Sequence, residues 1–267
     1  MSARRRLDAE LVRRGLVASR QVAQELIENG DVLVSGTVAT KSSRLVGPGE
    51  PVVVAAEPPR FVGRGGHKLD AALERFGIDV TGLVGLDAGS STGGFTDCLL
   101  QRGAARVHSI DVGRNQLHER LRVDPRVVVR ERTDIRSVRP DSLDDDIGIV
   151  VADLSFISVG RVAATLVELV VPGGPLVVLV KPQFEAGRAE VSRGRGVIRD
   201  PEIWERTLVA AGADIEGAGA TIMGAMVSPL RGADGNVEFL VHAVRPPLDG
   251  VSPPPVDYAA LVSEVVG

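Results

Sequence analysis

The chain has 267 residues, 44% hydrophobic and 25% charged, which suffices for one large or two modest globular domains and excludes a disordered or collagen-like chain. Its net charge of −4 is unevenly distributed: residues 1–66 hold ten Arg/Lys against seven Asp/Glu (+3), and residues 67–267 hold 21 against 28 (−7). A small basic module before a larger acidic body suggests that the front of the chain contacts nucleic acid.

Two further features bear on location. The most apolar stretch, residues 166–180, is only about 15 residues long and is interrupted by Glu168 and Pro172-Gly173-Gly174, so no membrane span is expected. The single cysteine, Cys98, can form no intrachain disulfide and supports no metal cluster, which fits a reducing compartment. With no address signal recognised, we expect a cytoplasmic protein.

The cations are strongly biased toward arginine. Only three of the 31 are lysines, namely Lys41, Lys68 and Lys181. A GC-rich genome explains such a bias wherever either cation serves. A lysine kept in this background is a candidate for a role that arginine cannot fill, because lysine can lose its proton and act as a base.

The first part of the chain predicts a compact α+β unit. Apolar side chains recur at helical spacing in two stretches, and Ser19 is placed to cap the second helix. The predicted elements are two helices within residues 7–30, a strand with a tight turn over 32–38, and a strand over 51–55. Glu57-Pro58-Pro59 and the glycines of 63–66 then interrupt regular structure, so we place a domain at 1–59 and a linker at 60–66.

From residue 68 onward, strand and helix patterns alternate. Strands are expected at 83–87, 106–111, 126–130, 147–153, 176–181, 221–227 and 237–244, and helices at 69–76, 93–102, 114–121, 159–171 and 201–211. This alternation predicts an α/β, Rossmann-like, doubly wound parallel sheet over residues 67–245 whose last two strands are antiparallel. A proline-rich tail, 246–267, follows and leads to a short terminal helix.

A glycine-rich segment, Asp87 to Thr96, leaves the first of these strands and opens a helix. Its glycines let the backbone approach a ligand, and a helix N-terminus attracts an anion. The spacing is neither that of a dinucleotide site nor that of a phosphate-binding loop with its lysine. Asp111, at the end of the next strand, could hold ribose hydroxyls, and Asp134, after the third, could accept from an adenine amino group. A ligand that has a carboxylate, a ribose and an adenine but no phosphates would match these three features, and S-adenosylmethionine is such a ligand.

A second set of polar residues is spread along the chain. Lys68, Asp153, Lys181 and Glu238 lie in separate segments, and Asp153 and Lys181 end predicted central strands. Ligands of such sheets bind at the carboxyl ends of the strands, so these side chains are expected to converge there.

On these motifs the chain resembles the TlyA family of ribosomal-RNA 2′-O-methyltransferases, also called haemolysins. Residues 4–55 are similar to the αL RNA-binding motif of a small-subunit ribosomal protein, on Arg6-Leu7-Asp8, Ser19-Arg20, Leu26-Ile27, Gly30-Asp31-Val32 and Ser35-Gly36. Residues 60–245 resemble an FtsJ-like methyltransferase. Two positions depart from the pattern: Ser35, where asparagine is common, and Gly63, where serine is frequent.

The resemblance implies a mechanism and a set of site residues. Lys68, Asp153, Lys181 and Glu238 would form the catalytic tetrad, with Lys181 taking the proton of the ribose hydroxyl or stabilising the developing alkoxide. The cofactor S-adenosylmethionine would be bound by Asp87, Gly89, Ser90, Ser91, Thr92, Gly93, Gly94, Phe95, Asp111 and Asp134. Ribosomal RNA or ribosomal subunits would be the partner, contacted by Arg4, Arg5, Arg6, Arg13, Arg14, Arg20, Lys41, Arg64, Arg188, Arg193 and Arg195.

Three alternatives remain open on the sequence. A membrane-active haemolysin should carry an amphipathic or apolar insertion segment, and we find none. An RNA-binding protein that has lost catalysis should lack part of the tetrad, which is intact here. A base methyltransferase usually carries an Asn/Asp-Pro-Pro-aromatic motif or a catalytic cysteine, whereas the corresponding strand here ends in Asp153-Leu154-Ser155-Phe156.

Overall fold

A computed structural model describes residues 4–28, 30–55, 60–232, 234–247 and 253–266. The chain divides into two compact units, Met1–Arg60 and Phe61–Gly267. The segment Glu57-Pro58-Pro59, expected to break structure between the domains, lies outside the described residues.

The first unit is a small α+β fold with its own apolar core. Its elements are β1 (Arg5–Arg6), α1 (Leu7–Arg13), α2 (Arg20–Glu28), β2 (Val32–Val34), β3 (Thr37–Val38), β4 (Leu45–Val46) and β5 (Val52–Val54). Strands β3, β2 and β5 form an antiparallel sheet, and β1 pairs with β4. Of the apolar positions expected on the two helices, Leu7, Leu11, Ala23 and Ile27 are fully buried in the core of this unit. Leu16, also expected on the first helix, lies beyond the end of α1 and is exposed. The predicted helices, strands and turn of this unit are confirmed.

The second unit is built on a seven-stranded sheet. Its strands are β6 (Val84–Ala88), β7 (Arg106–Asp111), β8 (Val127–Glu131), β9 (Ile149–Ala152), β10 (Pro175–Val180), β11 (Thr221–Val227) and β12 (Phe239–Val244). They lie in the order β11-β12-β10-β9-β6-β7-β8. All neighbours pair in parallel except β12, which runs antiparallel to both β10 and β11. The predicted Rossmann-like sheet is therefore confirmed, with β12 as its one reversed strand.

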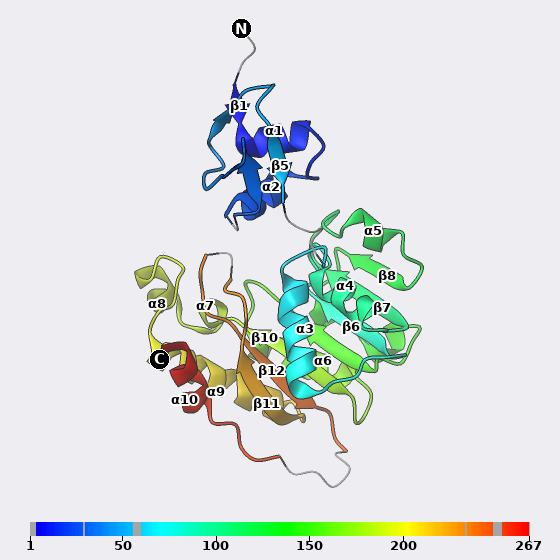
Figure 1. Cartoon of the computed structure of the whole chain (residues 1–267). Helices are drawn as coiled ribbons and strands as arrows, with labels where there is room; N and C mark the ends of the chain where they lie inside the picture. Colours follow the sequence, from blue (N-terminus) through cyan, green and yellow to red (C-terminus); the bar gives the residue numbers. More distant parts are fainter. Residues whose placement is uncertain (1–3, 29, 56–59, 233, 248–252, 267) are drawn as a thin grey trace. The chain divides into compact units, whose positions relative to one another are not determined.

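Helices cover both faces of this sheet (Figure 1). They are α3 (Gly65–Phe76), α4 (Gly94–Gln101), α5 (Glu119–Arg122), α6 (Ala163–Leu169), α7 (Pro182–Glu185), α8 (Arg188–Arg193), α9 (Pro201–Gly217) and α10 (Tyr258–Val266), with the short 3-10 turns η1 (Ile135–Ser137), η2 (Pro140–Ser142) and η3 (Val159–Arg161). Helix α10, at the end of the predicted tail, packs on α9 and β11.

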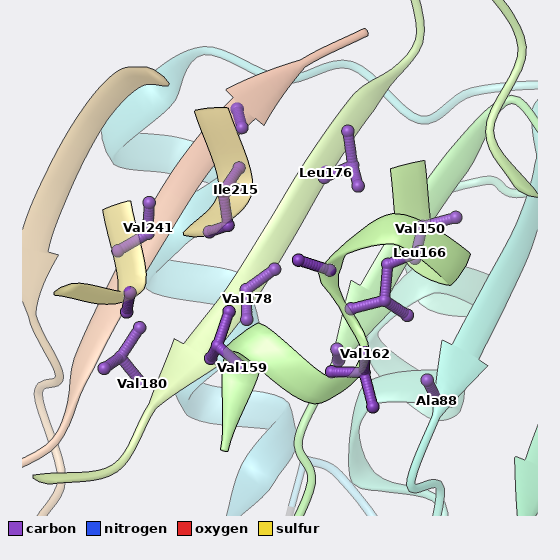
Figure 2. Close-up of a cluster of buried hydrophobic side chains, with 14 of the residues drawn as sticks. Ala88, Val150, Val159, Val162, Leu166, Leu176, Val178, Val180, Ile215 and Val241 are labelled. Atoms are coloured by element: carbon purple, nitrogen blue, oxygen red, sulfur yellow. The ribbon is translucent and has the colours of Figure 1, made fainter. Parts of the chain in front are cut away.

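The sheet separates two layers of core, and successive side chains of β10 point alternately into one and the other. Leu176, Val178 and Val180 face the layer formed with α6 and α9, as Figure 2 shows. Val177 and Leu179 face the opposite layer, formed with α3 and α4. A strand buried on both faces has a continuous apolar sequence, which is why 176–180 contains no polar residue.

Several segments differ from the expectations. The helix expected at 159–171 consists of η3 and α6, and α9 continues to Gly217 where 211 was expected. Residues 61–66 were expected to be a linker, but they belong to the second unit: Phe61 is buried and α3 already begins at Gly65. The helix expected at 114–121 is reduced to α5, because Asn115 takes a left-handed conformation and His118 caps a helix that begins only at Glu119. Arg188–Arg193 forms α8, a helix that is absent from the expected elements.

Candidate active site

The four predicted catalytic residues come from elements that meet at one edge of the sheet. Asp153 follows β9 and Lys181 follows β10, at the carboxyl ends of two neighbouring parallel strands. Glu238 precedes β12, which runs in the opposite direction, so its first residue pairs with the last residue of β10. Lys68 lies in the first turns of α3. The reversal of β12 thus brings an acid from the start of a strand to the edge where the other strands end.

Lys68 and Glu238 form a buried ion pair. Lys68 Nζ donates to Glu238 Oε2 at 2.5 Å, and the two side chains are 9% and 3% exposed. The contact joins α3 to the start of β12, 170 residues further along the chain. Two buried charges that are paired avoid most of the cost that either would carry alone.

Lys181 and Asp153 form a second pair with more access to solvent. Lys181 Nζ lies 2.5 Å from Asp153 Oδ1, and the side chains are 11% and 23% exposed. Lys181 Nζ also donates to Ser155 Oγ at 3.1 Å and lies 5.8 Å from the centre of the Phe184 ring. A β-carbon placed on Gly65 would lie 3.8 Å from Asp153 Oδ2, which puts this pair beside the first turn of α3.

The glycine-rich segment follows β6 and packs directly against this edge. Gly89 has φ +85°, and a β-carbon there would lie 2.5 Å from the carbonyl oxygen of Asp153. Gly93 has φ +97°, and a β-carbon there would collide with Leu121 and Leu117. Both positions require glycine for conformation and for space. The backbone of this loop is consequently held between Asp153 and the residues before β8.

Asp87 lies beneath the loop and is completely buried. Its Oδ2 accepts from the backbone N–H of Thr96 at 2.9 Å and from Thr96 Oγ1 at 2.7 Å. Its Oδ1 has no hydrogen-bond partner among the described residues. Burial raises the pKa of Asp87 to about 7, and the nearby carboxylates of Asp153 and Asp111 act in the same direction. The unpaired oxygen is an acceptor that a donor on a ligand would satisfy.

Asp111 ends β7 beside the same loop. Its two oxygens each accept one backbone N–H, from Ser91 at 2.8 Å and from Gly113 at 2.6 Å. A carboxylate has about four acceptor positions, so this geometry fixes the group while leaving acceptor capacity for further donors. Contact with ribose hydroxyls, which the sequence predicts for Asp111, is compatible with these free acceptor positions.

The remaining predicted cofactor residues differ in their surroundings. Ser90 and Gly94 are buried, Thr92 accepts a backbone hydrogen bond from His118, and Phe95 is part of the apolar core beside α3. Asp134 caps η1, and Arg136 forms an ion pair with it at 2.5 Å that lowers its pKa to about 2. An interaction of Asp134 with an adenine amino group therefore has to coexist with Arg136.

Several arginines of the first unit that we expected to contact RNA form ion pairs with the buried acids Asp8 and Glu10. Asp8 is paired with Arg6 and Arg20, and Glu10 with Arg13 and Arg14. Arg14 also donates to the carbonyl oxygens of Glu50 at 2.8 Å and Gly47 at 3.0 Å. Arg14 therefore links α1 to the segment before β5. The arginines Arg6, Arg13 and Arg20 are more exposed.

The other expected RNA contacts are mostly at the surface. Arg4 lies 3.6 Å from Glu50, and Arg5 and Lys41 are exposed. In the second unit, Arg64 donates to the carbonyl oxygen of Arg231 at 2.8 Å. Arg193, the last residue of α8, is exposed, and so is Arg195, which follows the helix. Arg188 begins α8, and its side chain lies outside what the structure describes.

Three residues of the site region were not found from the sequence. Asn236 is buried and links the backbone at Ile198 and Gly196 to the segment before Glu238. Asp97 accepts from the Val62 backbone N–H and from Arg120. Glu185 accepts from the Val159 backbone N–H, and burial raises its pKa to about 7. The only sequence signal for these three residues is a polar side chain among apolar ones. Their hydrogen-bond partners are distant in the sequence and cannot be read from it.

Among the described residues, no helix is long and apolar enough to cross the bilayer core. The same residues contain no group of three or more His, Cys, Asp or Glu side chains able to hold a metal ion.

Comparison with known proteins agrees with this architecture. A family model for FtsJ-like methyltransferases matches residues 61–245, and a model for the S4 domain matches residues 5–52. The 16S/23S rRNA (cytidine-2′-O)-methyltransferase TlyA of Mycobacterium tuberculosis is 47% identical over 242 residues, which cover 90% of each chain. The chain belongs to the TlyA family of FtsJ-like methyltransferases.

Other proteins similar to this chain carry a different name. Hemolysin A of Brachyspira hyodysenteriae is 39% identical, over 90% of this chain and 99% of its own. A solved structure of a hemolysin candidate from Streptococcus thermophilus is 34% identical, with a TM-score of 0.76, and covers 100% of this chain and 97% of its own.

Proposed function

We propose that this protein transfers a methyl group from S-adenosylmethionine to the 2′-hydroxyl of a cytidine in ribosomal RNA. The observation that carries the proposal is the pair of lysine–carboxylate contacts, Lys68–Glu238 and Lys181–Asp153, beside a glycine-rich loop. The relative in M. tuberculosis bears the name of an enzyme with this activity on 16S and 23S rRNA, and its sequence aligns with 90% of this chain.

The residues around the loop fit the proposed cofactor. Asp87 Oδ1 is a buried acceptor without a partner among the described residues, and Asp111 keeps acceptor capacity after receiving two N–H groups. Gly89 adds no side chain at the point where the loop meets the Asp153 backbone. These features suit a ligand with an amino-acid part and a ribose. When bound, S-adenosylmethionine supplies an electrophilic methyl group on sulfur.

Lys181 is the residue we assign to the proton of the ribose hydroxyl. A ribose hydroxyl is a poor nucleophile, and a nearby group that takes its proton or stabilises its negative charge lowers the barrier. Lys181 Nζ donates a hydrogen bond to Ser155 Oγ at 3.1 Å and lies 2.5 Å from Asp153 Oδ1, an ion-pair contact that does not have hydrogen-bond geometry. Lys68 and Glu238, which are more deeply buried, orient the hydroxyl and the second pair.

In this proposal the S4 domain binds the RNA. Its cations would contact backbone phosphates, and the 2′-hydroxyl distinguishes RNA from DNA at the site. We include Arg4, Arg5, Arg6, Arg13, Arg20 and Lys41 in this surface and give Arg14 a structural role, because it donates inward to backbone carbonyls. Arg64, Arg188, Arg193 and Arg195 would contact RNA from the methyltransferase domain.

Methyl transfer to purified rRNA tests the proposal. The protein is incubated with methyl-labelled S-adenosylmethionine and, separately, 16S rRNA, 23S rRNA and each ribosomal subunit. The products are digested to nucleosides and separated. We expect label in 2′-O-methylcytidine with at least one substrate and none with the Lys181→Met variant. Label in a methylated base, or equal label with Lys181→Met, would overturn the proposal.

A further inference from the structure

The most densely hydrogen-bonded carboxylate of the described S4 domain belongs to Asp8. Its side chain is 0% exposed, and it accepts five hydrogen bonds. Arg6 donates from Nε and Nη2 at 3.1 and 3.0 Å, and Arg20 from Nη2 at 2.8 Å. Gln24 and the backbone N–H of Ala9 complete the set at 3.1 and 2.8 Å. These bonds to the charged form keep the pKa of Asp8 far below its usual range.

The two guanidinium groups held by Asp8 are open to solvent. Their side chains are 45% and 57% exposed, although both meet the same oxygen, Oδ2. A guanidinium has five N–H donors. Arg6 gives two of its nitrogens to Asp8 and Arg20 only one, so Nη1 of Arg6 and Nε and Nη1 of Arg20 have no partner among the described residues. The result is a pair of arginines with fixed positions and spare donors.

Charge favours anion binding by this pair. Two guanidinium groups close together repel each other, and the buried carboxylate between them offsets that repulsion while leaving a net charge of +1. Phosphate is the anion whose geometry matches paired guanidinium groups, because each can donate two parallel hydrogen bonds to it.

We propose that Asp8 is a positioning residue that holds Arg6 and Arg20 as a two-arginine site for one backbone phosphate of the RNA. This inference rests on the proposed function, since it requires an RNA substrate. It assigns a binding role to an acidic residue in a domain whose other expected contacts are basic.

The sign of the effect separates this role from simple electrostatics. Asp8→Asn removes a negative charge from an RNA-binding domain, so charge alone predicts tighter binding. Positioning predicts weaker binding, because the freed arginines repel each other and lose their common acceptor. We expect the affinity for rRNA to fall about tenfold, the usual effect of losing hydrogen bonds to a charged group.

The experiment measures rRNA affinity of the full-length protein across a salt series. For Asp8→Asn we expect weaker binding and a salt slope reduced by about 0.7–0.9, the amount that one phosphate contributes. Glu28→Gln is the matched control, because Glu28 is an exposed acid of the same domain and undergoes the same charge change. It should leave affinity unchanged or slightly raise it. Unchanged or tighter binding by Asp8→Asn, or weaker binding with an unchanged slope, overturns the inference.

Two further variants keep the test decisive. In the Asp8→Asn background, Arg20→Ala should cost less affinity than in the wild type, because the two residues act as a unit. If thermal melting shows that Asp8→Asn unfolds the S4 domain, Gln24→Leu replaces it. That variant removes one donor to Oδ2 and changes no charge. We expect about twofold weaker binding, and no change overturns the inference.

The proposed function and this inference fail in distinguishable ways. If the wild-type protein neither binds nor methylates rRNA, the proposed function is wrong. If the wild type does both and Asp8→Asn binds at least as well, only the role of Asp8 is wrong.

Discussion

The two lysine–carboxylate pairs at the sheet edge contain the same groups at the same 2.5 Å separation, yet they differ in access. Lys68–Glu238 is enclosed, whereas the Asp153 side chain of the other pair is 23% exposed. The second pair also has a hydroxyl, that of Ser155, and aromatic rings beside it. Phe184 lies near Lys181 and packs against Phe156, which is 91% exposed.

This difference in access indicates different roles for the two pairs. A fully enclosed pair contributes to the shape of the site and is costly to break, because the remaining charge stays buried. A pair open on one side can meet a substrate without rearrangement. We therefore expect mutations in the enclosed pair to affect folding first, and mutations in the open pair to affect the chemical step first.

The strongest test replaces Lys181 with arginine, which keeps the charge but cannot give up its proton at working pH. If Lys181 acts as a base, single-turnover methylation should slow by about 10²–10⁴-fold with little change in KM. Lys41→Arg, in the S4 domain, is the control and should be nearly silent because only charge is needed there. A wild-type rate for Lys181→Arg would show that Lys181 acts through charge alone.

The second test compares the folding stability of the two pairs. Glu238→Gln leaves Lys68 buried without its counter-charge and should lower the free energy of unfolding of the methyltransferase domain by about 3–5 kcal/mol. Asp153→Asn should cost clearly less, since Asp153 is partly solvated. Urea denaturation of both variants measures the difference. The reverse order would contradict the assignment of enclosed and open pairs.

The third test separates cofactor binding from both pairs. Asp111→Ala should weaken S-adenosylmethionine binding by about 1–3 kcal/mol, the cost of leaving polar groups of a ligand unpaired. Calorimetry measures this directly, and the methylation rate at saturating cofactor should stay near that of the wild type. Unaltered cofactor affinity would remove Asp111 from the binding site.

The smallest effect is expected at Ser155. Ser155→Ala removes one hydrogen bond to Lys181 Nζ, and such a bond contributes about 0.5–1.5 kcal/mol. We expect the loss in kcat, with the urea midpoint unchanged, because the open pair is not needed for folding. A loss of stability without a change in kcat would place Ser155 in the structural group with Glu238.

Much of the fold was predictable because its signals are local. The strand at 106–111 begins and ends as expected, and the apolar run of 176–180 forms the central β10. The helix expected over 114–121 is wrong for a tertiary reason. Residues 113–118 pack beside the glycine-rich loop, with Gly113 donating to Asp111 and His118 donating to Thr92, and these contacts replace helical hydrogen bonds.

The candidate site was predictable as a set of residues but not as a set of contacts. The family resemblance supplied Lys68, Asp153, Lys181 and Glu238 together, and their assignment as catalytic residues stays a prediction. The sequence predicts that the last strands run antiparallel, but it does not report that the reversed β12 brings Glu238 to Lys68 and leaves Asp153 to Lys181. The inward direction of Arg14 is likewise invisible in sequence, where it looks like any other cation of a basic helix.

The close approach of Gly89 to Asp153 joins two parts of the site that are usually treated separately. Because a β-carbon at residue 89 would meet the Asp153 backbone, any side chain there must displace either the loop or the strand end that carries the acid. A substitution at residue 89 should therefore not weaken binding of the methyl donor alone. It should also disturb the position of Asp153. Genetic screens that sort loss-of-function alleles by donor and acceptor phenotype should find Gly89 alleles in both groups.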